Sequence, residues 1–410
     1  MLRYLLISFL FITVINAETY FIAPDGSDDY EGTLAKPFAT VTRAQTAVKA
    51  GDTVFIRGGI YKVNKSHISR QHKIWKYVFE LNKSGEVNKA ITYSAYKNEK
   101  PVFDFQNLEA EGMRITAFYV SASWLHIKGL TVTGVKAAKA GHTQSECFEN
   151  NGSNNIYEQL TMYRNQAIGI YHLRGSANLF LNCDAFENHD FTSGDKLGGN
   201  VDGFGAHPQK GSTNNVFRGC RAWFNSDDGF DCINSFESVT FENCWAFYNG
   251  MDTNFKSLAD GNGFKIGGYG STPVHRLPEI FPRHITKNCL AVRNKAYGFY
   301  ANHHIGGGDW INNRAYGNKI NFNMLCRKKD NLTDIPGTAH KLIGNISWKG
   351  RKGEIGQIAD SGNILENNRF FHADQIKKSD FISLDEKLLT APRKEDGSLP
   401  DSKFLMLKEQ

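Results

Sequence analysis

The sequence predicts an all-β fold: a single parallel β-solenoid with a capping helix at its N-terminal end and an irregular tail at its C-terminal end. Two observations predict it. A six-residue motif recurs at spacings that suit one coil of a solenoid, and a Gly-Phe pair recurs in step with it. Long amphipathic helical patterns are missing, whereas Gly and Asn are abundant.

The six-residue motif reads Cys-x-Ala-x-x-Asn. Four segments carry it in full: CDAFEN from Cys183, CRAWFN from Cys220, CWAFYN from Cys244 and CLAVRN from Cys289. NRAYGN from Asn313 replaces the Cys, and LTMYRN from Leu160 is a looser copy. The terminal asparagines lie 23, 37, 24, 45 and 24 residues apart: Asn165, Asn188, Asn225, Asn249, Asn294 and Asn318. A minimum near 23, with insertions, predicts coils whose strands pair with the coils above and below.

Equivalent residues of successive coils should therefore stack into columns. Asn suits a column at a bend, because its amide bonds to its neighbours and it tolerates left-handed backbone. The cysteines fall on an apolar column and are expected to be small buried hydrophobes. A disulfide between Cys220 and Cys244 is the alternative.

The ends of the chain differ from the repeats. Residues 1–17 predict a cleaved secretory signal, with a retained membrane anchor as the alternative, and hence a secreted or periplasmic protein. Residues 41–48 predict a helix that covers the open end of the solenoid, with Thr40 as N-cap and Gly51 as C-cap. We expect the solenoid to span residues 18–372, and residues 373–410 to pack along it or over its C-terminal end.

The charge of the chain excludes some partners. The formal net charge is +6 and is spread along all 410 residues. Such a balance tolerates an acidic partner. No basic helix or basic-aromatic stripe is present, so nucleic acid is not an expected partner. No later stretch is long enough to span a membrane, and we expect a monomer.

The Gly-Phe pair aligns a second set of segments: DGFGAH (202–207), DGFDCI (228–233), NGFKIG (262–267) and YGFYAN (297–302). The four phenylalanines should stack inside the solenoid. Side chains alternate along a strand, so the residue after each Phe should point outward. These outward residues are Gly205, Asp231, Lys265 and Tyr300.

Four carboxylates converge in this register. Asp202 and Asp228 share the column before the glycine, Asp227 lies beside them, and Asp231 follows one position after Phe230. Like charges this close are costly unless they are protonated or bind a cation. Oxygen-only ligands favour Ca²⁺, although solvated turn aspartates are the alternative.

Lys265 should lie next to Asp231, one coil away. It is either a surface lysine paired with that acid or a catalytic base that must first lose its proton. The acids outweigh one Ca²⁺ and oppose that loss. A metal that binds a carboxylate beside a base suits removal of the hydrogen α to that carboxylate. In a 4-linked uronic acid polymer, β-elimination would follow, and a solenoid offers a long groove for such a chain.

At this point the sequence resembles polysaccharide lyase family 9, the right-handed parallel β-helix pectate lyases and their rhamnogalacturonan lyase relatives. The resemblance covers nearly all of the mature chain and includes GDTVFIRGGIY, NVDGFG, SDDGFD, NGFKIGG and GFYANHHIGG. It implies a calcium-dependent lyase acting on acidic polysaccharide. It also implies that Asp202, Asp227, Asp228 and Asp231 are calcium ligands and that Lys265 is the Brønsted base.

Other assignments stay open at the level of sequence. Tyr300 and His303 are candidate substrate contacts, whereas adjacent His303 and His304 do not suit a shared zinc ion. One rival is a β-helix glycoside hydrolase that uses Asp202, Asp227 and Asp228. Another is a calcium-stiffened solenoid that binds glycans without cleaving them. The residues do not decide between homogalacturonan and the rhamnose-alternating backbone.

Overall fold

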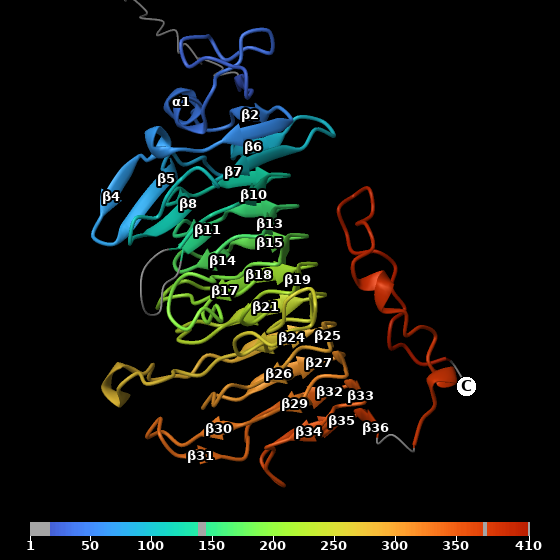
Figure 1. The fold of residues 1–410 in the computed structure, drawn as a ribbon. Helices are drawn as coiled ribbons and strands as arrows, with labels where there is room; N and C mark the ends of the chain where they lie inside the picture. Colours follow the sequence, from blue (N-terminus) through green and yellow to red (C-terminus); the bar gives the residue numbers. More distant parts are fainter. Residues whose placement is uncertain (1–16, 138–144, 372–374, 409–410) are drawn as a thin grey trace, which may run out of the picture.

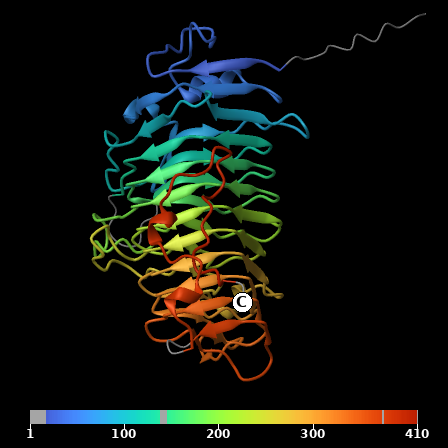
Figure 2. The same ribbon diagram turned by 90° about the vertical axis from the view of Figure 1, so that its right-hand side faces the viewer.

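The chain folds into a long solenoid whose wall consists of three parallel β-sheets (Figures 1 and 2). This computed structural model describes residues 17–137, 145–371 and 375–408. The central coils each contribute one strand to each sheet in the order A, B, C, and these strands pair in parallel with their equivalents in the neighbouring coils. At the N-terminal end, the strand Arg70–His72 adds an antiparallel edge to sheet C. The predicted all-β solenoid is confirmed.

Sheet A has twelve strands: β1 (Thr19–Ile22), β2 (Thr53–Ile56), β6 (Ile91–Ala95), β9 (Leu125–Lys128), β12 (Ile156–Glu158), β15 (Leu179–Leu181), β18 (Asn215–Arg218), β21 (Val239–Glu242), β24 (His284–Lys287), β27 (Gly308–Ile311), β32 (Lys341–Ile343) and β35 (Ile364–Glu366). Sheet B has eleven: β3 (Gly59–Lys62), β7 (Pro101–Asp104), β10 (Thr131–Thr133), β13 (Thr161–Tyr163), β16 (Asp184–Phe186), β19 (Arg221–Trp223), β22 (Trp245–Phe247), β25 (Leu290–Val292), β28 (Arg314–Tyr316), β33 (Ile346–Trp348) and β36 (Arg369–Phe371).

Sheet C also has eleven strands: β4 (Arg70–His72), β5 (Trp75–Leu81), β8 (Arg114–Val120), β11 (Ser145–Asn150), β14 (Ala167–His172), β17 (Phe204–Ala206), β20 (Phe230–Asp231), β23 (Phe264–Lys265), β26 (Tyr297–Tyr300), β29 (Ile320–Asn323) and β34 (Ile355–Gly356). A separate antiparallel pair is formed by β30 (Cys326–Arg327) and β31 (Asp334–Ile335). The helices are α1 (Val41–Ala47) and short 3-10 turns at Lys65–His67, Val274–Arg276, Lys378–Asp380 and Glu386–Leu389.

The predicted asparagine column lines the turn between sheets B and C. The Nδ2 of Asn225 donates to Oδ1 of Asn249 at 3.0 Å, and Asn249 donates in the same way to Asn294 at 3.0 Å. The backbone N–H of each also donates to the next Oδ1. The ladder runs from Asn165 to Asn318 and is buried throughout. The buried amides are thus satisfied from coil to coil.

The Gly-Phe pair and the six-residue motif meet inside the solenoid. Phe204, Phe230, Phe264 and Phe299 form the predicted stack, with neighbouring ring centroids 4.9, 4.7 and 5.0 Å apart. The glycine before each Phe faces the Ala and Asn of the motif. A Cβ on Gly229 would lie 2.8 Å from Asn249 Nδ2 and 3.0 Å from Ala246 Cβ. Only glycine permits this approach of sheet C to the Asn turn.

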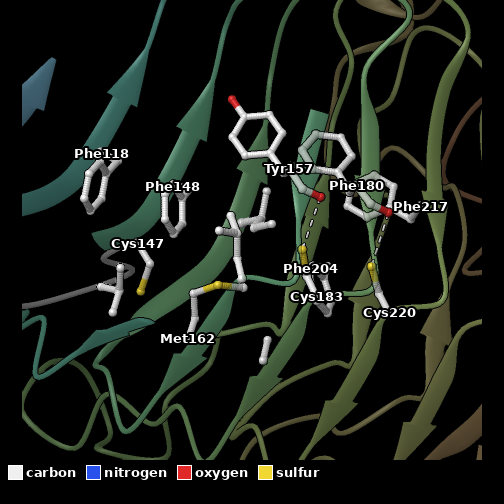
Figure 3. Packing of buried hydrophobic residues seen from close by; sticks show 14 of the residues in the cluster. Phe118, Cys147, Phe148, Tyr157, Met162, Phe180, Cys183, Phe204, Phe217 and Cys220 are labelled. Carbon is white, nitrogen blue, oxygen red and sulfur yellow. Dashed lines mark hydrogen bonds between the residues drawn. The ribbon is translucent and has the colours of Figure 1, made fainter. Parts of the chain in front are cut away.

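The cysteine column is buried and reduced. All seven cysteines are free and buried, so the alternative of a Cys220–Cys244 disulfide is wrong. Figure 3 shows Cys183 and Cys220 donating to carbonyl groups of the coil above, those of Tyr157 and Phe180, each at 3.4 Å. Where the motif replaces Cys by Asn313, the amide continues the column and accepts from the Cys289 N–H at 2.9 Å.

Helix α1 covers the N-terminal end of the solenoid, as predicted. The Thr40 side chain accepts from the Arg43 N–H, which confirms the N-cap. The predicted C-cap at Gly51 is wrong, because the helix ends earlier, with Val48 as C-cap in extended backbone. Burying the Val48 side chain requires the chain to leave the helix there, and Gly51 instead forms a later turn with φ of 94°.

The C-terminal segment runs back along the outside of sheet B, which was one of the two predicted placements (Figure 2). Its apolar side chains Ile376, Phe381, Leu389 and Phe404 pack on a sheet B cluster that includes Trp223, Trp245, Phe247 and Trp348. The tail therefore covers the apolar outer face of the later strands of sheet B, whereas Ile60 on β3 stays 57 % exposed.

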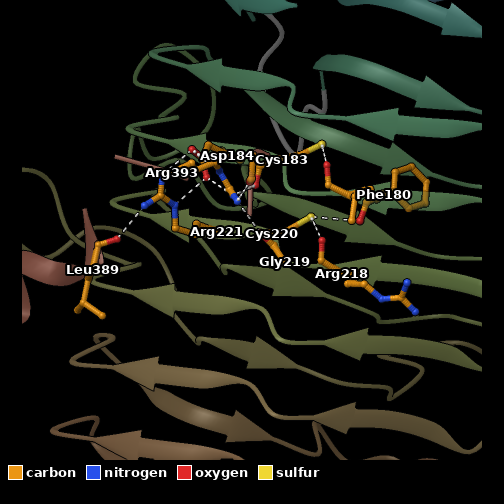
Figure 4. A network of polar contacts seen from close by, with 12 residues as sticks. Phe180, Cys183, Asp184, Arg218, Gly219, Cys220, Arg221, Leu389 and Arg393 are labelled. Carbon is orange, nitrogen blue, oxygen red and sulfur yellow. Dashed lines mark hydrogen bonds and ion pairs between the residues drawn. The ribbon is translucent and has the colours of Figure 1, made fainter. Parts of the chain in front are cut away.

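A partly buried ion-pair network fastens this tail (Figure 4). Arg393 donates to both carboxylate oxygens of Asp184, at 2.6 and 3.1 Å, and to the Gly219 carbonyl at 3.0 Å. Arg221 pairs with the same carboxylate and reaches the tail carbonyl of Ala391 at 2.8 Å. Burial alone would raise the pKa of Asp184, but the two guanidinium groups hold it below its usual value.

Residues 1–16, which include nearly all of the predicted signal, lie outside the described residues. Across the remainder that the structure describes, helices are too short or too polar to traverse a bilayer.

We predict that Arg393→Ala lowers the free energy of unfolding by about 2–3 kcal/mol. Removing one partner of a buried pair costs about 3–5 kcal/mol, and Arg221 still compensates part of the Asp184 charge. Urea denaturation measures the change. Lys394→Ala is the control, because its pair with Asp401 is exposed. Equal stabilities of the two variants would contradict the role given to Arg393.

Candidate active site

The candidate site lies on the outer face of sheet C, at β17, β20, β23 and β26. The observed register pairs Gly205 with Asp231, Asp231 with Lys265, and Lys265 with Tyr300. Each predicted outward residue therefore has the neighbours that the Gly-Phe alignment gave it. The parallel pairing sets successive side chains about one strand spacing apart, about 4.8 Å.

Three of the four predicted acids form a compact group just before these strands. Carboxylate oxygens of Asp202, Asp227 and Asp228 all lie within 4.8 Å of one another. All three residues are buried, with exposed fractions of 2, 6 and 0 %. Burying three carboxylates together is costly unless protons or a cation neutralise them. The donor set, oxygen only, fits a hard divalent cation.

Hydrogen bonds from the backbone fix the orientation of these carboxylates. Asp227 accepts from the N–H groups of Asn200 at 2.6 Å and Asp260 at 3.1 Å. Asp228 Oδ1 accepts from both the N–H and the Nδ2 of Asn262, at 2.6 and 2.7 Å. The Asp228 N–H in turn donates to Asp202 Oδ1 at 3.1 Å. One oxygen of Asp228, Oδ2, remains without an aligned hydrogen bond.

The ammonium group of Lys265 lies against this acid group. Its Nζ is 3.0 Å from Asp228 Oδ2 and 3.1 Å from Asp231 Oδ2. Asp231 stands outside the group of three and forms the other side of the lysine pocket. Only 13 % of the Lys265 side chain is exposed. The lysine does pair with Asp231, as the surface alternative expected, but it is not a solvent-exposed residue.

Burial and mutual repulsion set the charge state of the site. Burial, followed by the neighbouring acids, raises the pKa of Asp202 well above its usual range. The same causes raise the pKa of Asp227 to about 8 and that of Asp228 to about 6. Burial would lower the pKa of Lys265, but Asp228, Asp231 and Asp227 raise it well above its usual value. Without a cation, the lysine is the counter-ion of the acids.

The two candidate substrate contacts lie next along the same face. The Tyr300 ring packs on Tyr297 at 4.7 Å and on His303 at 5.9 Å. His303 Nδ1 lies 2.7 Å from Asp334, which also pairs with Arg327. His304 is buried, with Nδ1 accepting from the Gly268 N–H and Nε2 2.7 Å from the Pro282 carbonyl. This separation of the two histidines agrees with rejecting a shared zinc site.

Sequence reasoning missed Asn262 and His207. Asn262 stands one coil below Asp228 in the column before the glycine, where its amide takes the place of a third carboxylate. The alignment of DGFD with NGFK contained that signal. His207 closes the DGFGAH segment, and its contact to Ile233 joins loops that follow two different strands. The alignment of DGFGAH with DGFDCI contained this signal too, because it places His207 and Ile233 at equivalent positions of adjacent coils.

Comparison with known proteins identifies the family. Residues 20–331 match the family described as Pel9A-like, right-handed beta helix region. The chain belongs to this family. It is 32 % identical to pectate lyase L of Dickeya chrysanthemi over 95 % of this chain and 83 % of that protein. It is 29 % identical to pectate lyase PEL9 of Emericella nidulans over 97 % of this chain and 94 % of that protein.

Two solved structures show the same architecture. A rhamnogalacturonan lyase superposes with a TM-score of 0.90 and 40 % identity, covering 96 % of this chain and 97 % of its own. The pectate lyase Pel9A superposes with a TM-score of 0.73 and 28 % identity, covering 96 and 90 %. This right-handed β-helix protein is thus a polysaccharide lyase of the pectate lyase type, and the non-cleaving glycan binder is set aside.

We predict that the metal-free protein loses stability as pH rises from 6.5 to 8. The folded-state pKa of Asp227, about 8, exceeds its unfolded value of 3.8. The folded chain therefore binds this proton more tightly, and its stabilising contribution is lost as pH rises through that range. Urea denaturation with a chelator present measures the slope. Buried neutral histidines such as His304 act in the opposite sense only below about 6.5.

Asp227→Asn is the matched control for this pH dependence. The amide keeps the shape of the side chain but does not titrate. The free energy of unfolding of the variant should therefore change less between pH 6.5 and 8 than that of the unaltered protein. Parallel slopes for the two proteins would show that Asp227 is ionised already at neutral pH.

Proposed function

We propose that this protein is a calcium-dependent lyase that cleaves acidic pectic polymers, polygalacturonate first among them, by β-elimination. One observation carries the proposal: a buried lysine, 3.0 Å from Asp228 and 3.1 Å from Asp231, borders a compact group of buried carboxylates on the outer face of sheet C. Family membership supports the same reading, because the relatives at 32 and 29 % identity are pectate lyases.

The residues present fit a calcium ion. Asp202, Asp227 and Asp228 supply carboxylate oxygens that already lie together, and Asp231 lies next to them across Lys265. The Oδ2 atom of Asp228 lacks an aligned hydrogen bond and lies 3.0 Å from Lys265 Nζ, so a bound cation could take the place of the ammonium as its partner. When bound, calcium would supply positive charge that holds a substrate carboxylate and stabilises the enolate-like charge at its α carbon.

Lys265 is the group placed to move the proton. As a neutral amine, its Nζ would take the hydrogen from C5 of a galacturonate unit. The electron pair of that C–H bond forms the C4–C5 double bond, and the C4–O4 bond breaks. The departing oxygen takes a proton from water, and Lys265 returns its proton to solvent before the next turnover. Asp231 keeps the amine directed along the column.

The glycoside hydrolase alternative fits less well. An inverting pair of carboxyl groups stands about 6.5–9.5 Å apart to hold a water between them. Oxygens of Asp202, Asp227 and Asp228 approach within 4.8 Å, and a lysine borders the group. Hydrolysis also needs no amine at this position.

A rhamnogalacturonan backbone is the second candidate substrate. A rhamnogalacturonan lyase superposes on this chain at 40 % identity and a TM-score of 0.90, compared with 28 % and 0.73 for Pel9A, and this similarity supports the second candidate. The elimination is the same, because the galacturonate unit carries the reacting hydrogen in both polymers. We also propose that residues 1–17 direct export of the protein from the cytoplasm. Such polymers occur outside the cell.

We predict that polygalacturonate or rhamnogalacturonan treated with the protein gains ultraviolet absorbance from unsaturated product ends. A chelator should abolish the gain, and added calcium should restore it. Initial rates on the two purified polymers rank the two substrates. New reducing ends without the absorbance would show hydrolysis, and their complete absence on both polymers would reject the proposed activity.

We predict that Lys265→Ala and Lys265→Arg both lower kcat by about 10²–10⁴, the usual contribution of a general base. Arginine keeps the positive charge but does not release its proton, so it separates charge from base chemistry. Activity is measured by the absorbance of unsaturated ends under saturating calcium. Substantial turnover by the arginine variant would remove proton transfer from the role of this residue.

The same two variants also test the burial of the lysine. Lys265→Ala should destabilise the metal-free protein, because it leaves Asp228 and Asp231 without their counter-ion. Lys265→Arg should retain more of that stability. Calcium should stabilise the alanine variant by more than it stabilises the unaltered protein, and thermal denaturation with and without calcium measures the difference.

A further inference from the structure

His207 follows strand β17 and lies beside the acid group without belonging to it. Its side chain is buried, with 7 % of the residue exposed. The Nδ1 atom lies 2.6 Å from the carbonyl oxygen of Ile233, so Nδ1 carries the proton. The other ring nitrogen, Nε2, is buried and has no hydrogen-bond partner. A buried acceptor left unpaired costs stability, so this nitrogen calls for an explanation.

The contact between His207 and Ile233 leads to the lysine. The Ile233 N–H donates to Asp231 Oδ1 at 2.7 Å. The other carboxylate oxygen of Asp231 lies 3.1 Å from Lys265 Nζ. The carbonyl group of Ile233 is therefore held by His207, and the N–H of Ile233 orients Asp231. If His207 moved, Ile233 and then Asp231 would move with it, and the position of Lys265 would change.

Gly205 explains why the imidazole lies where it does. The outward column contains Asp231, Lys265 and Tyr300 in later coils, but it has no side chain at Gly205. An added Cβ there would lie 2.8 Å from His207 Nε2 and 3.0 Å from Tyr171 Cδ2. The ring of His207 thus lies across the glycine and packs on Tyr171, with ring centroids 4.9 Å apart. No side chain could stand at 205 without moving the ring.

We propose that His207 is a positioning residue for Lys265 and that Gly205 is retained to let it act. The imidazole fixes Ile233, Ile233 fixes Asp231, and Asp231 directs the amine toward the substrate. This inference rests on the proposed function, in which Lys265 takes the C5 proton. His207 itself does not contact the reacting atoms.

Three substitutions test the link. His207→Phe keeps a ring but removes the N–H that bonds to Ile233, whereas His207→Asn keeps a donor near the position of Nδ1. Gly205→Ala displaces the ring while leaving its chemistry intact. We expect His207→Phe and Gly205→Ala to lower kcat by about 10-fold to 100-fold with KM little changed, as a small misplacement of a catalytic group does. His207→Asn should recover most of the loss.

His172→Phe is the matched control. His172 is also buried with an unpartnered Nε2, and its side chain contacts Asn150, at 3.0 Å from Nδ1, and Phe180, with ring centroids 5.5 Å apart. Its carbonyl group accepts from the His207 N–H at 2.9 Å, a backbone bond that a side-chain substitution keeps. We expect it to lower the melting temperature by an amount similar to that for His207→Phe but to leave kcat unchanged. Equal kcat values for the two phenylalanine variants, or a loss confined to KM, would overturn the proposal.

A second measurement does not depend on turnover. The metal-free protein is treated briefly with acetic anhydride at one fixed pH, and acetylation of Lys265 is quantified by peptide mass spectrometry. A loosened amine should react several-fold faster in His207→Phe than in the unaltered protein or in His172→Phe. Equal labelling would reject the link. Failure of the unaltered protein to cleave either polymer would reject only the proposed function.

Discussion

The close approach of sheet C to the Asn turn is the constraint on which the structure depends. In each central coil a glycine backbone packs against the Ala and Asn of the six-residue motif. At Gly203 an added Cβ would lie 2.8 Å from Ala222 Cβ and 2.9 Å from Asn225 Nδ2. The Asn amide that blocks the side chain is the one that bonds to the next coil. One small contact thus sets coil height, strand register and the inward direction of the phenylalanine that follows.

A fixed register turns small differences between coils into a site. The positions that flank Gly-Phe face outward in every coil, so an acid in one coil and an amine in the next become neighbours without special backbone. Asp202, Asp228 and Asn262 occupy one column, and Asp231 and Lys265 occupy the other. The amide of Asn262 ends the acidic column and donates to Asp228 at 2.7 Å. The scaffold comes from what the coils share, and the chemistry comes from where they differ.

The same distinction separates what the sequence predicted from what it did not. The sequence predicted the Asn ladder, the Phe stack and the pairing of Asp231 with Lys265. Each follows from the repeats, because equivalent positions of successive coils stack and so come into contact. The burial of Lys265 does not follow from the repeats, because the alignment says only that this side chain points outward. A second ladder through Asn155, Asn178 and Asn215 escaped notice because Val239 follows Asn215 in the same column and interrupts the run.

The end of α1 and the course of the tail show a related limit. Gly51 has the residue type of a C-cap, but packing of Val48 ends the helix earlier. Tertiary burial thus decided a boundary that local residue preference had placed three positions further on. The tail carries apolar residues without a period. Its binding surface on sheet B, built around Trp223, Trp245 and Trp348, can be recognised only once those side chains are stacked.

Charge balance links the proposed cation to the proposed base. In the metal-free protein, Lys265 neutralises Asp228 and Asp231, and those acids in turn hold its proton. An amine held in this way is a poor base. A divalent cation among Asp202, Asp227 and Asp228 would replace the ammonium as counter-ion, so the free energy that retains the proton on Lys265 would fall as the ion binds. The same acids would thus keep the lysine charged until another cation bound them, which would couple the activity of the proposed base to the presence of that ion.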